Sequence, residues 1–224
     1  MENISKSLKR NISEIKEKKN NLIIEHSIVQ SRLEFVLEQK YKTKKHLAMS
    51  LLNEMINLEE QGFDLGQLNE QFNLFGFLGS LFGGSFKNID SVIGEYLVDG
   101  IANKFGVNQG SYFYNVLKAA ITNTNIADYG KFFTDCKFLV NTVCKALFEG
   151  LVLQQQEKRE IGQDGAKGFL INALRNAIVD AIDESKVVAK LEGLVSGILC
   201  EAQAKWRQNI TNLGQQLQTN LGTT

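Results

Sequence analysis

An apolar stripe of helical period runs through the first sixty residues of this chain and constrains its fold more than any other feature. From Ile4 to Leu58 the stripe advances in steps of three or four residues, which is the spacing of one face of an α-helix. No glycine occurs before Gly62, and the 224-residue chain contains no proline, the residue that interrupts helical hydrogen bonding. The apolar members are Ile4, Leu8, Ile12, Ile15, Leu22, Val29, Leu33, Val36, Leu47, Leu51, Met55 and Leu58, and the polar members are Lys19, His26, Lys40 and Lys44.

A continuous helix over residues 4–58 would be about 80 to 85 Å long at 1.5 Å per residue, which exceeds the diameter of a compact domain of this size. We therefore expect the helix to pair with another chain, to fold back at a bend, or to lie on a surface. The four polar members depart from an ideal zipper, because the seam of a coiled coil favours apolar residues. The pattern predicts an irregular coiled coil or a helical bundle.

Residues 62–86 interrupt the stripe with six glycines and six phenylalanines. Glycine gives the backbone freedom, and phenylalanine brings a large apolar surface that needs burial. The composition predicts a hinge over residues 62–88 between a long amphipathic arm, residues 1–61, and a helical body, residues 89–224.

The body is predicted as successive amphipathic helices around one core, with a long helix at its C-terminal end. Gly106 is expected to end the first body helix, and Asp135 to cap a helix that runs to about Glu160. The expected spans are residues 89–105, 111–122, 126–133, 136–160, 164–182 and 186–220. The predicted fold class is all-α, a long N-terminal helical arm joined to a compact multi-helix bundle.

Charge and hydropathy exclude several classes of protein. Lysine plus arginine total 25, as do aspartate plus glutamate, so the chain lacks the basic excess of a duplex nucleic-acid binder. The charged N-terminus does not resemble a signal peptide, and no apolar run reaches the length of a membrane span. We expect a protein that is neither exported by a signal peptide nor integral to a membrane.

The three cysteines, Cys136, Cys144 and Cys200, do not resemble a disulfide framework, because their number is odd and their spacing wide. They are expected to be small buried hydrophobic residues in a reducing compartment, and no CxxC pair suggests zinc.

No catalytic residues, cofactor or metal ligands are predicted. The two histidines, His26 and His46, lie on the arm, 20 residues apart and away from the cysteines. The glycines of residues 76–84 do not match the spacing of a phosphate-binding loop. The lysines between residues 40 and 45 are interpreted as a solvated helical face.

Membrane activity, either α-helical pore formation or membrane insertion, is the alternative function. Residues 71–86 are uncharged and rich in glycine and phenylalanine, which suits insertion into a membrane interface after a conformational change. A subunit contact or an interdomain plug is the other reading of the same segment.

Residues 123–150, NTNIADYGKFFTDCKFLVNTVCKALFEG, carry a resemblance that rests on Ile126, Asp128, Tyr129, Asp135, Cys136 and the amphipathic helix that follows. This stretch, about an eighth of the chain, is similar to helical, proline-poor virion-associated proteins of large marine tailed phages. The resemblance implies a structural protein of a viral particle, located in the virion or the host cytoplasm, and it implies no active site.

The leading hypothesis is a non-enzymatic structural or assembly protein that associates with other protein subunits, as a homo-oligomer or within a larger assembly. The residues predicted to form the interface are Ile15, Leu22, Val29, Val36 and Leu47 on the arm, and Phe72, Phe75, Phe77, Phe82 and Phe86 in the hinge.

Overall fold

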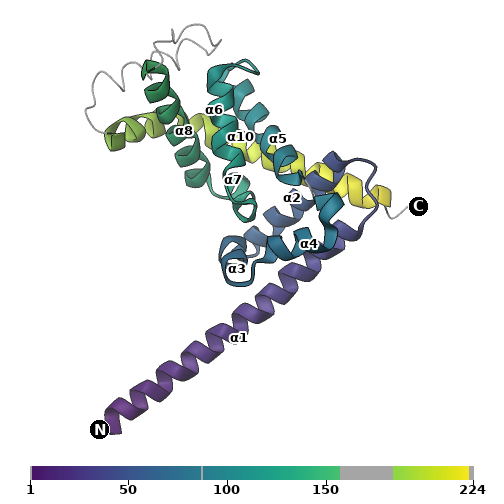
Figure 1. The fold of residues 1–224 in the computed structure, drawn as a ribbon, viewed down its shortest axis with the longest axis vertical. Coiled ribbons are helices and arrows are strands. Elements are labelled where there is room, and N and C mark those ends of the chain that lie inside the picture. Colours follow the sequence, from purple (N-terminus) through teal and green to yellow (C-terminus); the bar gives the residue numbers. More distant parts are fainter. Residues whose placement is uncertain (1, 87, 157–183, 222–224) are drawn as a thin grey trace.

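The fold is all-α, as predicted. The computed structural model describes residues 2–86, 88–156 and 184–221, and within these residues it contains helices and no strand. The helices gather into one body, from which the N-terminal part of the first helix projects (Figure 1). Their bounds are α1 Glu2–Glu38, α2 Lys44–Glu60, α3 Leu65–Phe72, α4 Leu74–Phe86, α5 Ile89–Phe105, α6 Tyr112–Thr122, the 3-10 helix η1 Ile126–Asp128, α7 Lys131–Thr134, α8 Cys136–Gln156 and α10 Glu184–Leu221.

The chain turns back between α1 and α2, so the bend that was one of the three expected outcomes occurs and the helix over residues 4–58 is not continuous. Thr43 starts α2 with an extended backbone, and its hydroxyl oxygen accepts a hydrogen bond from the amide of His46 at 3.1 Å. Threonine in this position satisfies an amide that the first helical turn leaves free. The turn brings α2 back against α1, so only part of the predicted arm is an arm.

Burial of α2 explains the turn. This helix is apolar on more than one face, and its residues from Leu47 to Ile56 are all buried. A helix that is apolar all round needs neighbours on several sides, which a projecting arm cannot provide. In the fold α2 packs against α1, α3, α5, α7 and α10 and forms the centre of the body.

The predicted hinge over residues 62–88 is largely helical. Asp64 caps α3 by accepting a hydrogen bond from the amide of Gln67, and Asn73 ends it in the left-handed conformation at φ 50°. The next helix, α4, bends at Phe82, where φ is −108° and ψ is 15°. The phenylalanine-rich α4 packs against α1 and α3, so part of its apolar surface is buried within the chain, while Phe77 and Leu81 remain exposed.

The body helices follow the predicted caps closely. Gly106 ends α5 in the left-handed conformation at φ 67°, as predicted. The side chain of Ser111, for which no cap was predicted, caps α6. Asp135 caps α8, because its carboxylate accepts hydrogen bonds from the amides of Lys137 and Phe138 at 2.9 and 3.2 Å. The last predicted helix, residues 186–220, is confirmed as α10, whereas the helix predicted over residues 164–182 lies outside the described residues.

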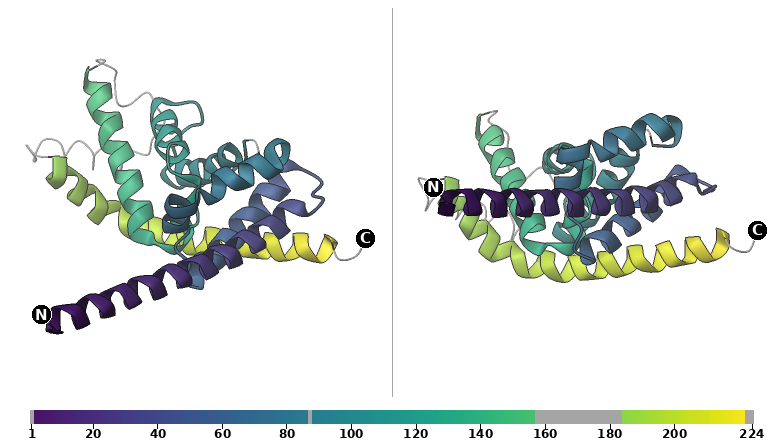
Figure 2. Two further views of the ribbon diagram at one scale, coloured as in Figure 1. Left: turned by 60° about the horizontal axis from the view of Figure 1, so that its bottom comes forward. Right: turned by 90° about the horizontal axis from the view of Figure 1, so that it is seen from below.

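The C-terminal helix α10 crosses the body and packs against α2, α5, α7 and α8 (Figure 2). Two glycines permit these close approaches. A Cβ atom on Gly100 of α5 would lie 3.1 Å from the Trp206 ring, and one on Gly214 of α10 would lie 2.6 Å from the Asn53 side chain of α2. At either distance, a methyl group added to the glycine would force a neighbouring atom to move.

Candidate protein-interaction surface

The first part of α1 extends beyond the body. Every residue from 10 to 21 is exposed, whereas α1 packs on α2, α3 and α4 farther along. We call residues 10–21 the overhang. In both Figure 1 and the left view of Figure 2 this part of α1 stands clear of the other helices. An isolated helix of this length is marginally stable in water, so the overhang depends on its continuity with the packed half of α1.

The apolar stripe that packs α1 on the body continues onto the overhang. Val29 and Leu33 are fully buried against the body, while Ile12 and Ile15 are 51% and 66% exposed. Between Ile12 and Val36 the stripe advances in alternating steps of three and four residues, the a/d spacing of a heptad. The same seam that joins α1 to its own body therefore extends past the edge of that body with nothing against it among the described residues.

The charges of the overhang are segregated around the helix. At about 100° per residue, Lys16 and Lys18 flank the stripe on opposite sides, each about 80° from it, and Lys19 lies within it. Glu14 and Glu17 lie about 120° and 180° away, on the back of the helix. The Arg10 guanidinium donates to the Glu14 carboxylate at 3.0 Å, an exposed pair that contributes little to stability. The stripe side of the overhang is thus basic.

A second apolar stripe lies on the opposite face of α1. Ile24, Ile28 and Phe35 are 58%, 42% and 61% exposed, and their spacing of four and seven residues places them on one face. We call these three residues the outer stripe. The sequence was expected to form a single stripe, and the outer stripe lies half a turn away from it. The spacing of Ile24, Ile28 and Phe35 was the available signal.

The ten predicted interface residues divide between core and surface. Val29, Val36, Leu47 and Phe75 are buried within this chain, where they form part of its own core. Leu22, Phe72, Phe82 and Phe86 are partly buried against the core. Ile15 and Phe77 are exposed and remain available to a partner.

Residue His26 shows where the stripe passes from overhang to body. Its ring lies 4.4 Å from that of Phe72 in α3, and burial lowers the pKa of its imidazole. The imidazole therefore packs between α1 and α3. The other histidine, His46, lies in the first turn of α2, where its amide donates to the capping Thr43.

A second polar feature lies where α2, α3, η1 and α7 meet. Lys131 donates to the Asp128 carboxylate at 2.8 Å and lies 3.6 Å from that of Asp64. Burial raises the pKa of Glu59 to about 7. The charges of Asp64 and Asp128 also raise this pKa, whereas the charge of Lys131 lowers it. Within the described residues, no group of histidine, cysteine, aspartate or glutamate side chains could hold a metal ion, so the arrangement is a set of ionic contacts between helices.

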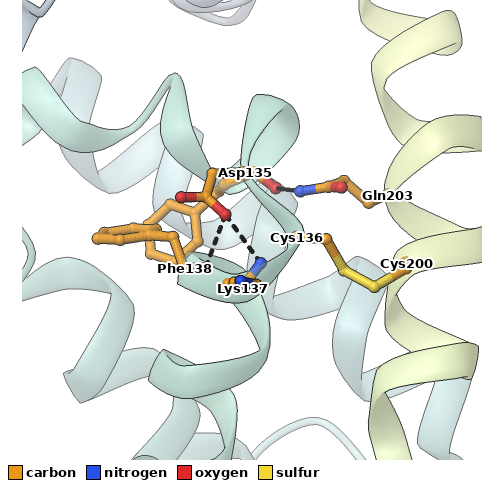
Figure 3. The surroundings of a disulfide bond; sticks show 7 residues. Asp135, Cys136, Lys137, Phe138, Cys200 and Gln203 are labelled. Carbon is orange, nitrogen blue, oxygen red and sulfur yellow. Dashed lines mark hydrogen bonds between the residues drawn. A yellow bond between two sulfur atoms is a disulfide. The ribbon is translucent and has the colours of Figure 1, made fainter.

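The expectation that the cysteines are unpaired is wrong for two of them. Cys136, the first residue of α8, forms a disulfide with Cys200 of α10, across 64 residues of sequence and a Cα–Cα distance of 5.4 Å. Beside it Gln203 is buried and donates to the carbonyl oxygen of Phe132 at 2.9 Å (Figure 3). The disulfide joins the start of α8 to α10, and the Gln203 hydrogen bond joins α7 to the same helix. Structural disulfides are typical of oxidising environments.

Cys144 is free and buried, as expected for a small hydrophobic residue. Burial raises the pKa of its thiol to about 12, so the thiolate is essentially absent near neutral pH. The thiolate is the reactive form of cysteine, so burial keeps this thiol weakly reactive.

The segment proposed for membrane contact is only partly exposed. Phe77 and Leu81 of α4 are open to solvent, but Phe75 is buried and Phe86 packs against the core. Among the described residues, no helix combines the length and apolar character needed to cross a bilayer.

Comparison of the chain with protein-family models, with curated proteins and with solved structures gives no significant match.

Proposed function

We propose that this protein is a non-enzymatic assembly subunit that binds a helix of another protein chain through the overhang of α1. The observation that carries the proposal is the continuity of one stripe: Leu33 packs the helix on its own body, and Ile15, on the same stripe, has no cover among the described residues. A coiled-coil seam gains its stability from such residues only when a second helix supplies the holes into which they pack.

The proposal includes a place in a viral particle, which is the role that the resemblance of residues 123–150 implies. The disulfide between Cys136 and Cys200 supports a particle exposed to an oxidising environment, because virion surfaces are among the places where disulfides persist.

A heptad peptide with isoleucine at a, leucine at d and glutamine at e and g tests the proposed docking without knowledge of the natural partner. The peptide is fluorescently labelled and kept at nanomolar concentration, and the full-length protein is titrated into it while anisotropy is measured. We expect saturable binding in the micromolar range that is lost when Ile12 and Ile15 are both replaced by serine.

Ile24→Ser is the matched control, because Ile24 is similarly exposed but lies on the outer stripe. This variant should bind the peptide as the wild type does. Absence of binding by the wild-type protein, or equal binding by the Ile12→Ser/Ile15→Ser variant, would refute docking through the overhang.

Membrane insertion of residues 71–86 has less support, because it would require α4 to leave its contacts with α1 and α3. Liposome leakage distinguishes the two functions. A membrane-active protein should release an entrapped dye and should lose that activity when Phe77 and Phe82 are replaced by serine, whereas an assembly subunit should release none.

A further inference from the structure

The charges beside the overhang stripe identify the chemistry of its partner. We infer that the overhang binds an acidic amphipathic helix of a different protein, in preference to a second copy of this chain. This inference rests on the proposed function, since it specifies which helix occupies the seam that the proposed function leaves open.

The first step of the argument is the position of the lysines. Lys16 and Lys18 lie at the e and g positions when Ile12 is assigned to a and Ile15 to d, and Lys19 then occupies the next a position. Residues at e and g face the charged flanks of a partner helix and determine partner choice. A helix with glutamate or aspartate at its own flanking positions would be attracted on both sides of the seam.

Self-pairing is disfavoured by the same three residues. In a parallel pair of overhangs Lys19 would face the Lys19 of the second copy within the seam. In an antiparallel pair centred on the overhang, Lys16 and Lys18 would each approach lysines of the second copy. The acidic residues cannot relieve this repulsion, because Glu14 and Glu17 lie toward the back of the helix. Like charges across a seam are a known means of excluding a wrong partner.

The narrowness of the apolar surface favours a helix over a lipid surface. A helix that lies in a membrane interface needs a broad apolar face, commonly with aromatic residues. Within the overhang only Ile12 and Ile15 are large and apolar, and Lys19 interrupts their line. A single helix covers such a seam, whereas a bilayer would leave Lys19 facing hydrocarbon.

Two heptad peptides test the inference. Both carry isoleucine at a and leucine at d, and they differ only in glutamate or lysine at e and g. The full-length protein is titrated into each peptide at about 0.1 M salt. We expect the glutamate peptide to bind at least tenfold more tightly than the lysine peptide, and the preference to weaken as salt is raised, because exposed charges are screened.

Charge reversal on the protein provides a sharper test of the inference. The Lys16→Glu/Lys18→Glu variant should prefer the lysine peptide, while Lys40→Glu/Lys42→Glu, which changes exposed lysines in the turn after α1, should keep the wild-type preference. Circular dichroism spectra and thermal midpoints equal to those of the wild type would show that the variants are folded.

Equal binding of the two peptides would overturn the inference and leave the proposed function standing, whereas binding of neither would overturn both. Two further outcomes would overturn the inference. One is a dimer of the protein in light scattering that Ile15→Ser abolishes. The other is capture on vesicles of phosphatidylcholine and phosphatidylserine that depends on Lys16 and Lys18, without binding of the glutamate peptide.

Discussion

Residue Glu59 makes the stability of the protein depend on pH. Its carboxyl is half-buried and its pKa is raised to about 7 by burial, so the folded state favours the protonated form more than the unfolded state does. Between the ordinary pKa of glutamate, about 4.3, and pH 7, the folded state binds more protons. The contribution of Glu59 to the free energy of unfolding is therefore fully present below the pKa of the unfolded state and is lost as pH rises through 7.

We predict that Glu59→Gln raises the thermal midpoint at pH 8 and leaves it nearly unchanged at pH 4.5, because the amide removes the cost of ionising a buried carboxyl. Thermal unfolding followed by circular dichroism at the two pH values measures the effect. Glu70→Gln, which alters an exposed carboxylate of α3, is the control and should shift neither midpoint. Equal shifts at both pH values would contradict the prediction.

Two glycines of α10 should respond to alanine in opposite directions. Gly197 is exposed with nothing among the described residues within 4 Å of a Cβ, so Gly197→Ala should stabilise by about 0.5 to 1 kcal/mol through helix propensity. Gly214→Ala gains the same propensity, but its methyl group would collide with buried Asn53, and it should destabilise by about 1 to 3 kcal/mol. Urea unfolding of the two variants measures both free energies, and a stabilised Gly214→Ala would disprove the close contact of α2 with α10.

At the scale of the helices, the disulfide stabilises the packing of α8 on α10. Closing a loop of 64 residues lowers the entropy of the unfolded chain, with a predicted effect of about 4 kcal/mol and a typical measured range of about 2 to 4 kcal/mol. We predict that Cys136→Ser/Cys200→Ser lowers the free energy of unfolding within that range. Dithiothreitol should destabilise the wild type by a similar amount and should leave the double variant unchanged, which makes the variant its own control.

The sequence predicts most helix ends of the body but not the turn between α1 and α2. Gly106, Ser111 and Asp135 carry recognisable capping chemistry, so the ends they mark are local properties of the chain. Residues 39–43 contain no glycine or proline, and the apolar period is the same on both sides of them. Thr43 supplies a local cap at the start of α2, but the turn as a whole follows from the many apolar neighbours that α2 requires, which is a property of the whole fold.

For the candidate surface, the sequence correctly places Ile15 on a long apolar stripe but cannot show where the body ends. The step from exposed Ile15 to buried Val29 marks where α2, α3 and α4 begin to pack on α1. Of these helices, α3 and α4 lie in the segment that the sequence suggests is a hinge. The pairing of Cys136 with Cys200 is likewise set by tertiary structure, because their separation of 64 residues carries no local signal.

At the scale of the whole molecule, the overhang and the body should behave as separate parts. We predict that deleting residues 1–20 leaves the thermal midpoint of the body unchanged, because residues 10–20 are exposed. Leu33→Ala, on the same stripe but within the core, should lower the free energy of unfolding by about 2 to 4 kcal/mol. A truncated protein that melts well below the full chain would show that the overhang packs against the body.

The bond between Cys136 and Cys200 also closes a covalent ring that contains the whole chain between them. A protease that cuts once between residues 137 and 199 therefore produces a nicked molecule whose two fragments stay joined. Electrophoresis of such a digest should show one band of full mass without reductant and two fragments with it. A backbone cut inside this ring would therefore leave the N-terminal and C-terminal parts of the body covalently attached to each other.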